Sequence, residues 1–232
     1  MAVKRKYGRK KDYTQQAFQG IRRLFFLNEI VPGQKIAYRH LAERLGMSPT
    51  PVIQALKRLE FQGLVRHEPN RGYYTEPISL DEVRQIYDFR QLIELSLLPQ
   101  GMQNAGKQGL ARLEKALERH LDSVRDPSGN PGNGSPISVQ AHMVRERLVR
   151  DMEFHLVLAR LSGCSVQVRT LESLFDLLYL KYRANLLFVS PVERVDTEHE
   201  QLFDAVRAQD LETARTVMAA HISNVKQHAV LN

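Results

Sequence analysis

The sequence contains a single cysteine, no tryptophan and no apolar run that approaches the roughly 18 residues needed to span a bilayer. A lone Cys164 excludes an intramolecular disulfide and favours a reducing compartment. The first residues are charged and lack the apolar stretch of a secretory signal. These absences predict a cytoplasmic protein with no membrane partner. The 43% apolar and 25% charged content of the 232 residues is typical of a globular chain with a buried core.

The net positive charge is confined to the first third of the chain. Residues 1–78 carry 15 Lys and Arg against 6 Asp and Glu, whereas residues 79–232 carry 18 against 20. This asymmetry indicates a polyanion-binding module joined to a module with another task, although charge alone also fits a solvated basic surface. Residues 1–12 are predicted to form a basic disordered arm, which either follows a phosphate backbone or serves as a solubilising tail.

The pattern of residues 13–76 predicts three helices and a hairpin. The expected elements are helices at 13–29, 38–45 and 48–62 and strands at 64–67 and 73–76. Gly46 is suited to close the second helix, and Ser48 followed by Pro49 to begin the third. The order helix, helix–turn–helix, hairpin wing describes a winged helix-turn-helix, and residues 77–79 form a linker.

In the remainder of the chain, residues 80–232, apolar residues recur at helical spacing and show no strand-like alternation, which predicts helices throughout. Helices are expected at 80–104, 108–125, 138–161, 165–187, 192–208 and 210–229. Residues 126–136 hold three prolines and three glycines, which predicts a flexible loop. The fold class is therefore mainly α: a winged helix-turn-helix followed by an antiparallel bundle of about six helices.

In a helix-turn-helix the second helix lies in the major groove and the first crosses the backbone. Hydroxyls and backbone N–H groups at a helix start suit phosphate oxygens, and arginine at a hairpin tip suits the minor groove. The predicted DNA-contacting residues are Arg39, Ser48, Thr50, Gln54, Lys57, Arg58, Arg71 and Gly72. A winged helix used for protein interaction is the alternative.

The segment PGQKIAYRHLAERLGMSPTPVIQALKRLEFQGLVRHEPNRGYY resembles the N-terminal domain of the GntR family of bacterial transcription regulators. The resemblance implies sequence-specific binding to double-stranded operator DNA. The family commonly has arginine before its Thr-Pro-Val stretch and Arg-Glu after it, where this chain has Pro49 and Ile53-Gln54. We therefore expect an operator that departs from the family's common half-site.

Asp151 and His155 are four residues apart and share one helical face, and His199 and His221 fall on two later helices. One carboxylate and three imidazoles suit a divalent transition metal such as zinc, nickel or manganese. On its own this pattern is weak, because most histidines so spaced are surface or core residues.

The second part of the chain is similar to the FadR-type (FCD) branch of the same family. Arg90-x3-Glu94, Asp151-x3-His155 and the stretch from Glu198-His199 to His221 carry the resemblance. It implies that Asp151, His155, His199 and His221 bind a metal inside the bundle, and that the effector is a small carboxylate. Three other histidines match nothing and are expected on the surface: His120, His142 and His228.

Two arginines, Arg90 and Arg183, are predicted to hold the effector carboxylate, because guanidinium pairs with it through two hydrogen bonds. The alternative for each is a structural salt bridge, with Glu94 as the partner of Arg90 one turn away.

The leading hypothesis is a homodimeric repressor or activator, not an enzyme, whose operator affinity is set by a metabolite. Two alternatives belong to other classes. A metal-dependent enzyme fused to a DNA-binding domain would use an open metal site to activate water, but no general base stands out in the sequence. A nonspecific DNA-architectural protein would leave the helical domain without a role.

Overall fold

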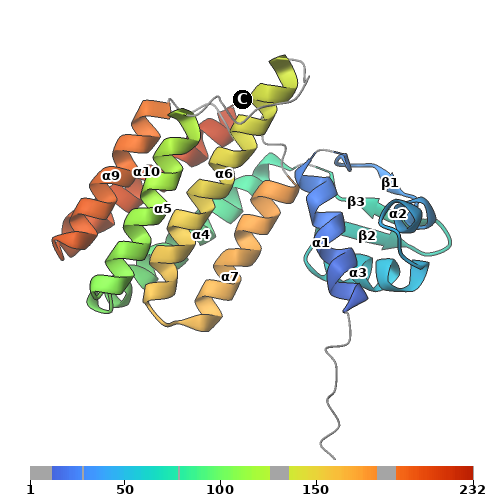
Figure 1. Cartoon of the computed structure of the whole chain (residues 1–232), viewed down its shortest axis with the longest axis horizontal. Coiled ribbons are helices and arrows are strands. Elements are labelled where there is room, and N and C mark those ends of the chain that lie inside the picture. The colour runs from blue at the N-terminus through green and yellow to red at the C-terminus, as the bar shows by residue number, and fades with distance from the viewer. Residues whose placement is uncertain (1–11, 28, 78, 126–135, 182–191, 232) are drawn as a thin grey trace, which may run out of the picture. The chain divides into compact units, whose positions relative to one another are not determined.

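The computed structural model describes residues 12–27, 29–77, 79–125, 136–181 and 192–231 (Figure 1). The basic arm up to residue 11, position 78 of the linker, residues 126–135 of the expected loop and the effector candidate Arg183 lie outside this range. The chain divides into two compact units, Met1–Ile78 and Ser79–Asn232.

The first unit is built on a helical core. Its elements are α1 (Tyr13–Phe26), β1 (Lys35–Ile36), α2 (Tyr38–Arg44), α3 (Pro49–Phe61), β2 (Val65–Glu68) and β3 (Gly72–Thr75). The side chain of Asp12 accepts the N–H of Gln15 and so caps α1. Ile21 on α1 and Leu56 and Leu59 on α3 are fully buried, and the two helices pack against each other. The apolar stripes that predicted these helices therefore form the core.

The wing is a three-stranded sheet rather than a bare hairpin. Its strand order is β1-β3-β2, with both neighbours antiparallel to β3. The sequence did not reveal β1, because two residues are too few to show alternation. The hairpin strands each lie one residue from their predicted bounds, in the register that places His67 opposite Tyr73. Asn70 and Gly72 have positive φ, as a tight turn requires.

The second unit consists of helices throughout its described residues. They are α4 (Leu80–Gln103), α5 (Lys107–Arg125), α6 (Pro136–Leu161), α7 (Ser165–Asp176), the π-helical turn η1 (Leu177–Lys181), α9 (Val192–Arg207) and α10 (Leu211–Leu231). The side chain of Ser79 caps α4 by accepting the N–H of Glu82. The helix expected at 165–187 changes from α-helix to a π-helical turn at Leu177–Lys181, and its last residues, 182–187, lie outside the described range.

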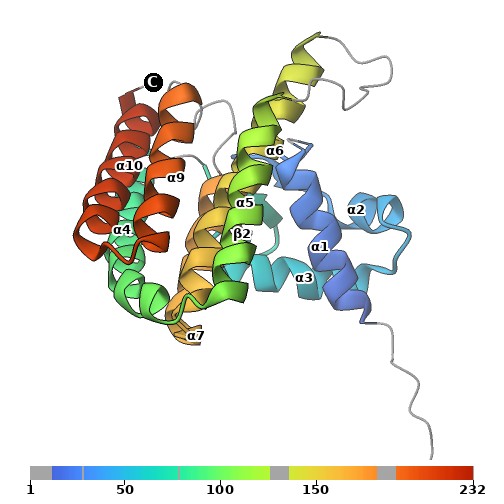
Figure 2. The ribbon, with the colours of Figure 1, turned by 60° about the vertical axis from the view of Figure 1, so that its left-hand side comes forward.

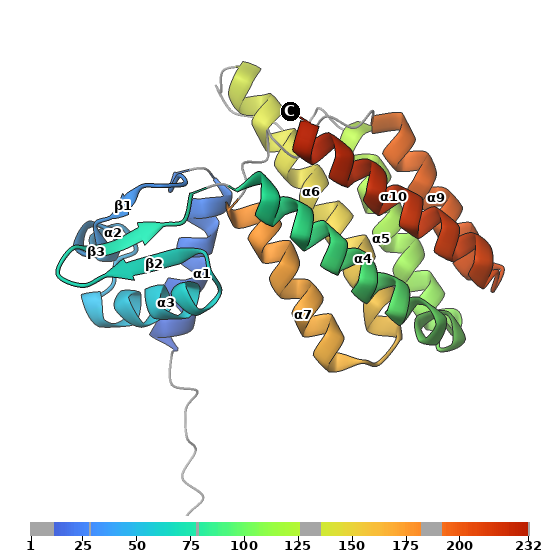
Figure 3. The same ribbon diagram turned by 180° about the vertical axis from the view of Figure 1, so that it is seen from behind.

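The helices of this unit pack in two layers. In Figure 1, α5 and α6 lie side by side toward the viewer, and Figure 3 shows α4 and α10 side by side on the opposite face. Figure 2 shows α9 beside α10, with which it packs. The predicted helical bundle is confirmed. No helix in the described residues is long and apolar enough to cross a membrane.

A glycine sets the spacing between α4 and α6. A Cβ atom at Gly101 of α4 would lie 3.2 Å from the backbone oxygen of Leu158 on α6. The missing side chain thus lets the two backbones approach closely. On the same pair of helices, Glu94 of α4 lies within hydrogen-bond distance of His155 of α6.

Candidate metal centre and DNA-contacting surface

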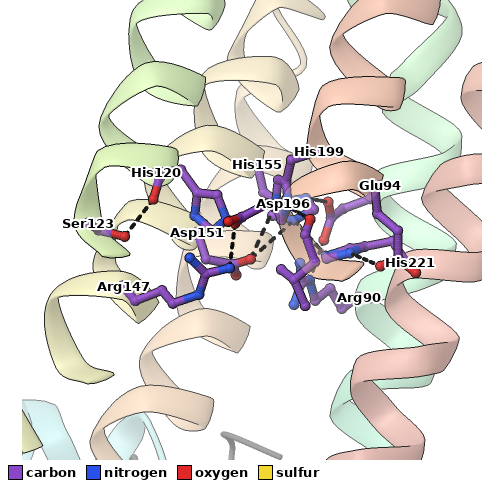
Figure 4. Close-up of polar contacts among 12 residues, drawn as sticks. Arg90, Glu94, His120, Ser123, Arg147, Asp151, His155, Asp196, His199 and His221 are labelled. Atoms are coloured by element: carbon purple, nitrogen blue, oxygen red, sulfur yellow. Dashed lines mark hydrogen bonds and ion pairs between the residues drawn. The ribbon is translucent and has the colours of Figure 1, made fainter. Parts of the chain in front are cut away.

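Asp151 and His155 of α6, His199 of α9 and His221 of α10 converge inside the helical unit (Figure 4). Each offers one ligand atom, and these atoms all lie within 4.8 Å of one another. The three histidines are buried and Asp151 is half-buried. The structure therefore brings together the four residues that the sequence singled out.

A hydrogen bond fixes the orientation of each histidine ring. Nδ1 of His155 lies 2.6 Å from Oε2 of Glu94, and Nδ1 of His221 lies 2.9 Å from Oε2 of Glu198. Nδ1 of His199 lies 2.7 Å from the backbone oxygen of Val195. Ionised carboxylate and carbonyl oxygens only accept, so each ring donates through Nδ1 and keeps a lone pair on Nε2. Metal-binding histidines in proteins are oriented in this way.

The Nε2 lone pairs converge with a carboxylate oxygen. Nε2 of His155 lies 3.3 Å from Nε2 of His221, and Nε2 of His199 lies 3.3 Å from Oδ1 of Asp151. Nε2 of His199 is buried and has no hydrogen-bond partner. Electron-rich atoms held so closely repel one another unless a cation lies among them. The donor set of three nitrogens and one oxygen fits a divalent transition metal.

The surroundings of the metal-ligand candidates favour the protonation states that bind a cation. Burial lowers the pKa of His221 to about 3 and also lowers the pKa of His155. Burial by itself would raise the pKa of Asp151, but the neighbouring His199, His155 and Arg90 hold it well below its usual value. At neutral pH the two histidines are neutral and the aspartate is ionised, which is the state that coordinates metal.

Arg90 is fully enclosed beside this cluster. Its Nε donates to Oε1 of Glu94 at 2.5 Å, and its guanidinium carbon lies 4.5 Å from the centroid of the Phe175 ring. Burial would raise the pKa of Glu94, but Arg90 and His155 outweigh it and lower that pKa to about 2. Nη2 of Arg90 is buried without a hydrogen-bond partner. The structural salt bridge expected as the alternative role of Arg90 is thus present, while one donor nitrogen stays unpaired.

The sequence analysis missed two residues of the site, and its expectation that one of them, His120, lies on the surface is wrong. His120 of α5, expected on the surface, has 0% exposure, and its ring centroid lies 4.2 Å from that of His199. Its spacing from the buried Leu113 and Ala116 places it on the apolar face of α5, a signal that could have found it. The hydroxyl of Tyr179, on η1, donates to Oδ2 of Asp151 at 3.0 Å. Nothing in the sequence pointed to Tyr179.

His228 is half-buried, so the surface expectation does not hold fully for it, and the side chain of His142 lies outside the described residues.

The predicted DNA-contacting side chains lie on the first unit, and all but the half-buried Gly72 are exposed. An open hollow of about 740 Å³ at the start of α3 is lined by Asp12, Tyr13, Thr14, Gly46, Met47, Ser48, Thr50, Pro51 and Gln54. Ser48 is the N-cap residue of α3 as predicted, but its side chain makes no capping hydrogen bond.

Two of these side chains contact α1. The hydroxyl of Thr14 donates to Oε1 of Gln54 at 2.6 Å, which leaves the amide N–H groups of Gln54 for a ligand. Arg58 donates to Oε1 of Gln15 at 2.7 Å, and its guanidinium carbon lies 3.9 Å from the centroid of the Phe18 ring. Arg58 thus ties α3 to α1, a role that the sequence did not suggest.

Comparison with known proteins yields two family matches. Residues 13–74 match the family described as bacterial regulatory proteins, gntR family, and residues 85–224 match the FCD domain.

Similar proteins span nearly the whole chain. The HTH-type transcriptional repressor RspR of Escherichia coli is 23% identical, over 92% of this chain and 87% of its own length. The HTH-type transcriptional regulator LutR of Bacillus subtilis is 28% identical, over 85% of this chain and 92% of its own length. Among solved structures, McbR/YncC of E. coli has a TM-score of 0.74 at 21% identity, covering 91% of this chain and 93% of that one.

Proposed function

Because the chain belongs to the gntR family of bacterial regulatory proteins and carries the FCD domain of that family, we propose that it is a transcription regulator controlled by a metal-bound carboxylate effector. Binding to operator DNA and ligand-responsive control follow from the family. The metal site, the class of effector and the contacting residues are the proposed part.

The convergence of the Nε2 atoms of His155, His199 and His221 with Oδ1 of Asp151 is the observation that carries the metal proposal. These four residues hold one divalent ion, with zinc, nickel and manganese as the candidates. Four protein ligands leave further positions on a five- or six-coordinate ion, and a carboxylate oxygen of the effector occupies one of them. Such an ion attracts an anionic ligand into an otherwise buried site.

Arg90 holds the bound carboxylate by its unpaired Nη2. Its salt bridge to Glu94, and the hydrogen bond of Glu94 to His155, link α4 directly to a metal ligand. Since α4 begins immediately after the linker at residues 77–79, a shift of α4 on ligand binding reaches the DNA-binding unit along the chain. A coupling of about 1–3 kcal/mol is the usual size of such an effect.

On DNA, the first turn of α3 presents Ser48 and Thr50 to phosphate oxygens, and Gln54 and Lys57 lie further along the same helix. Arg39 of α2 adds a backbone contact. Arg71 and Gly72 lie at the wing tip, where Arg71 is exposed despite a 3.7 Å approach to Glu68. Arg58 acts mainly by holding α3 against α1.

A homodimer places two such helices on two half-sites. The helical unit offers an apolar surface for this contact. Phe89 and Leu92 of α4 are 48% and 68% exposed, and Val166 of the adjacent α7 is 67% exposed. We expect Leu92→Glu to lower the sedimentation coefficient to that of a monomer, whereas Glu200→Gln on α9 leaves the dimer intact. A monomeric wild-type protein contradicts the dimer.

Catalysis at the metal would need a general base near a bound water. Among the described residues the neighbouring carboxylates are engaged otherwise: Glu94 with Arg90 and His155, and Glu198 with His221 and Asn224. This arrangement favours a sensor over the alternative of a metal-dependent enzyme.

The test is elemental analysis of the purified protein beside His155→Ala and His199→Ala, after incubation with zinc, nickel and manganese. We expect about one metal per chain in the wild type, loss in both variants and retention in the control His228→Ala. In a DNA mobility assay His199→Ala should still bind the operator but no longer respond to small carboxylates. Metal-free wild-type protein, or an unchanged response in His199→Ala, contradicts the sensing mechanism.

A further inference from the structure

The helix α7 ends in the π-helical turn η1, which carries two side chains that contact different parts of the helical unit. The hydroxyl of Tyr179 donates to Oδ2 of Asp151 at 3.0 Å. Two residues later, the ammonium group of Lys181 pairs with Oε2 of Glu82 in the first turn of α4. Figure 3 shows the end of α7 beside the beginning of α4. One short turn therefore contacts both a metal-ligand candidate and the start of the helix that follows the linker.

The two carboxylate oxygens of Asp151 have separate contacts. Oδ1 lies 3.3 Å from Nε2 of His199, whereas Oδ2 accepts from the hydroxyl of Tyr179. An ion held at Oδ1 fixes the carboxylate and so keeps Oδ2 in place as an acceptor. By linkage, a hydrogen bond that favours ion binding is itself stabilised by the ion. The Tyr179 ring stacks on buried Phe175 with centroids 5.7 Å apart, so the hydroxyl moves together with the turn.

The other contact of η1 fixes the first turn of α4. The side chain of Lys181 is 6% exposed and that of Glu82 is 35% exposed. A buried ammonium group needs a carboxylate beside it, because removal of the partner leaves an uncompensated charge. The N–H of Glu82 donates to Oγ of Ser79, the last residue of the linker, at 3.2 Å. The ion pair thus stabilises the turn of α4 nearest to the linker, about two turns before Arg90.

The helical spacing of η1 determines where Lys181 points. A π-helix has i→i+5 hydrogen bonds, and single π-helical turns occur frequently at functional sites. A return of Leu177–Lys181 to α-helical spacing would rotate the end of the turn by about 100°, the angle of one residue in an α-helix. Lys181 is the last residue of η1, so its contact with Glu82 depends on the π-helical spacing. The bond of Tyr179 to Asp151 holds that spacing from within the same turn.

We propose that η1 couples the metal site to the start of α4. Tyr179 responds to the bound ion through its hydrogen bond to Asp151, and Lys181 is a positioning residue for α4. When the ion stabilises the hydrogen bond, the turn keeps its π-helical spacing, and the Lys181–Glu82 pair stabilises the first turn of α4. This inference rests on the proposed metal-dependent sensing and adds the path by which the ion affects the linker.

The experiment first titrates the protein with zinc and then measures amide hydrogen exchange with and without saturating zinc. The reporters are the amides of η1 and those of Glu82 and Val83, which bond to Ser79. In the wild type, zinc should slow exchange at both places by about fivefold or more, the lower end of the usual coupling between two sites. The amide of Leu110 at the start of α5 should not change, since these reporters detect local opening.

Two substitutions test the order of the path. Tyr179→Phe removes the hydrogen bond to Asp151, so at saturating zinc neither η1 nor the start of α4 should respond. Lys181→Met replaces the buried ammonium group with an apolar side chain and leaves half-buried Glu82 to be solvated by water. Zinc should then slow exchange in η1 but no longer at Glu82 and Val83. Lys181→Arg keeps the charge and should restore the response of both amides.

Lys226→Met is the matched control, because Lys226 of α10 pairs with Asp88 further along α4. It should behave as the wild type. Absence of zinc binding overturns the proposed function itself. Zinc binding without slower exchange at Glu82 and Val83 overturns only the coupling, as does wild-type slowing of these amides in Tyr179→Phe or in Lys181→Met. Tyr179→Phe decides the proposal alone if Lys181→Met does not fold.

Discussion

Nε2 of His155 and Nε2 of His221 face each other at 3.3 Å, the length of a hydrogen bond that neither can donate. Each ring already donates through Nδ1, His155 to Glu94 and His221 to Glu198. Without a cation the facing Nε2 lone pairs on α6 and α10 repel each other. A cation bound between them is attracted by both. The carboxylates that orient the rings are as much a part of the site as the rings themselves.

The first prediction concerns Glu198, which orients His221. Glu198→Gln retains an oxygen that accepts from Nδ1 but loses the negative charge that strengthens the histidine as a ligand. We expect zinc affinity, measured by competition with a chromophoric chelator, to fall about tenfold or more. Glu200→Gln, an exposed neighbour on the same helix, provides the control. Equal affinities of the two variants would contradict an orienting role for Glu198.

The second prediction concerns the hydroxyl of Tyr179, which donates to Oδ2 of Asp151 and leaves Oδ1 toward the histidines. Tyr179→Phe keeps the ring that stacks on Phe175 and removes only the hydrogen bond. Zinc affinity should fall by about tenfold while the melting temperature of the metal-free protein changes little. Tyr74→Phe in the other unit serves as the control. If Tyr179→Phe binds zinc as the wild type does, Asp151 is positioned by the helix alone.

The third prediction addresses the DNA surface. Lys57 is exposed on α3, where its ammonium group reaches a phosphate in the proposed docking. Lys57→Gln should reduce the slope of log affinity against log salt concentration by about one and weaken binding to all sequences alike. Fluorescence anisotropy of a labelled duplex at several salt concentrations measures this slope. Lys107→Gln in the helical unit should leave it unchanged; a Lys57→Gln slope equal to that of the wild type places the contact elsewhere.

The fourth prediction concerns pH. Burial lowers the pKa of His120 to about 4, below the ordinary 6.5 that it regains on unfolding. Between these values the unfolded chain binds a proton that the folded chain does not, so the stability of the metal-free protein falls as pH decreases. The contribution of this one group approaches about 1.4 kcal/mol per pH unit over that interval.

His120→Leu removes this contribution, so its stability should depend less steeply on pH between 6.5 and about 4. The chain has no tryptophan, so urea unfolding is best followed by circular dichroism. His40→Leu, an exposed position on α2, should keep the wild-type slope. If the free energy of unfolding depends on pH equally in the wild type and in His120→Leu, the pKa of His120 in the folded protein is not lowered.

Local patterns predicted most of the fold, because the helices of both units follow their apolar stripes. The stripe on α1 and its partner on α3 meet in one core, and Gly46 has the positive φ that closing α2 requires. The strand β1 escaped detection because its two residues are extended only through pairing with Tyr73 and Tyr74 of β3. The π-helical turn at Leu177 likewise leaves no periodic signal.

By itself the sequence determined which residues could share a helical face, such as Asp151 with His155. It offered His199 and His221 only as a weak addition, which a resemblance to a known family strengthened. Only the tertiary structure decided that these side chains meet, that Glu94 and Glu198 orient two of the rings, and that His120 is buried against His199. The physical reason is range. Helical periodicity records neighbours three and four residues apart, whereas each of these contacts joins different helices and depends on how those helices pack.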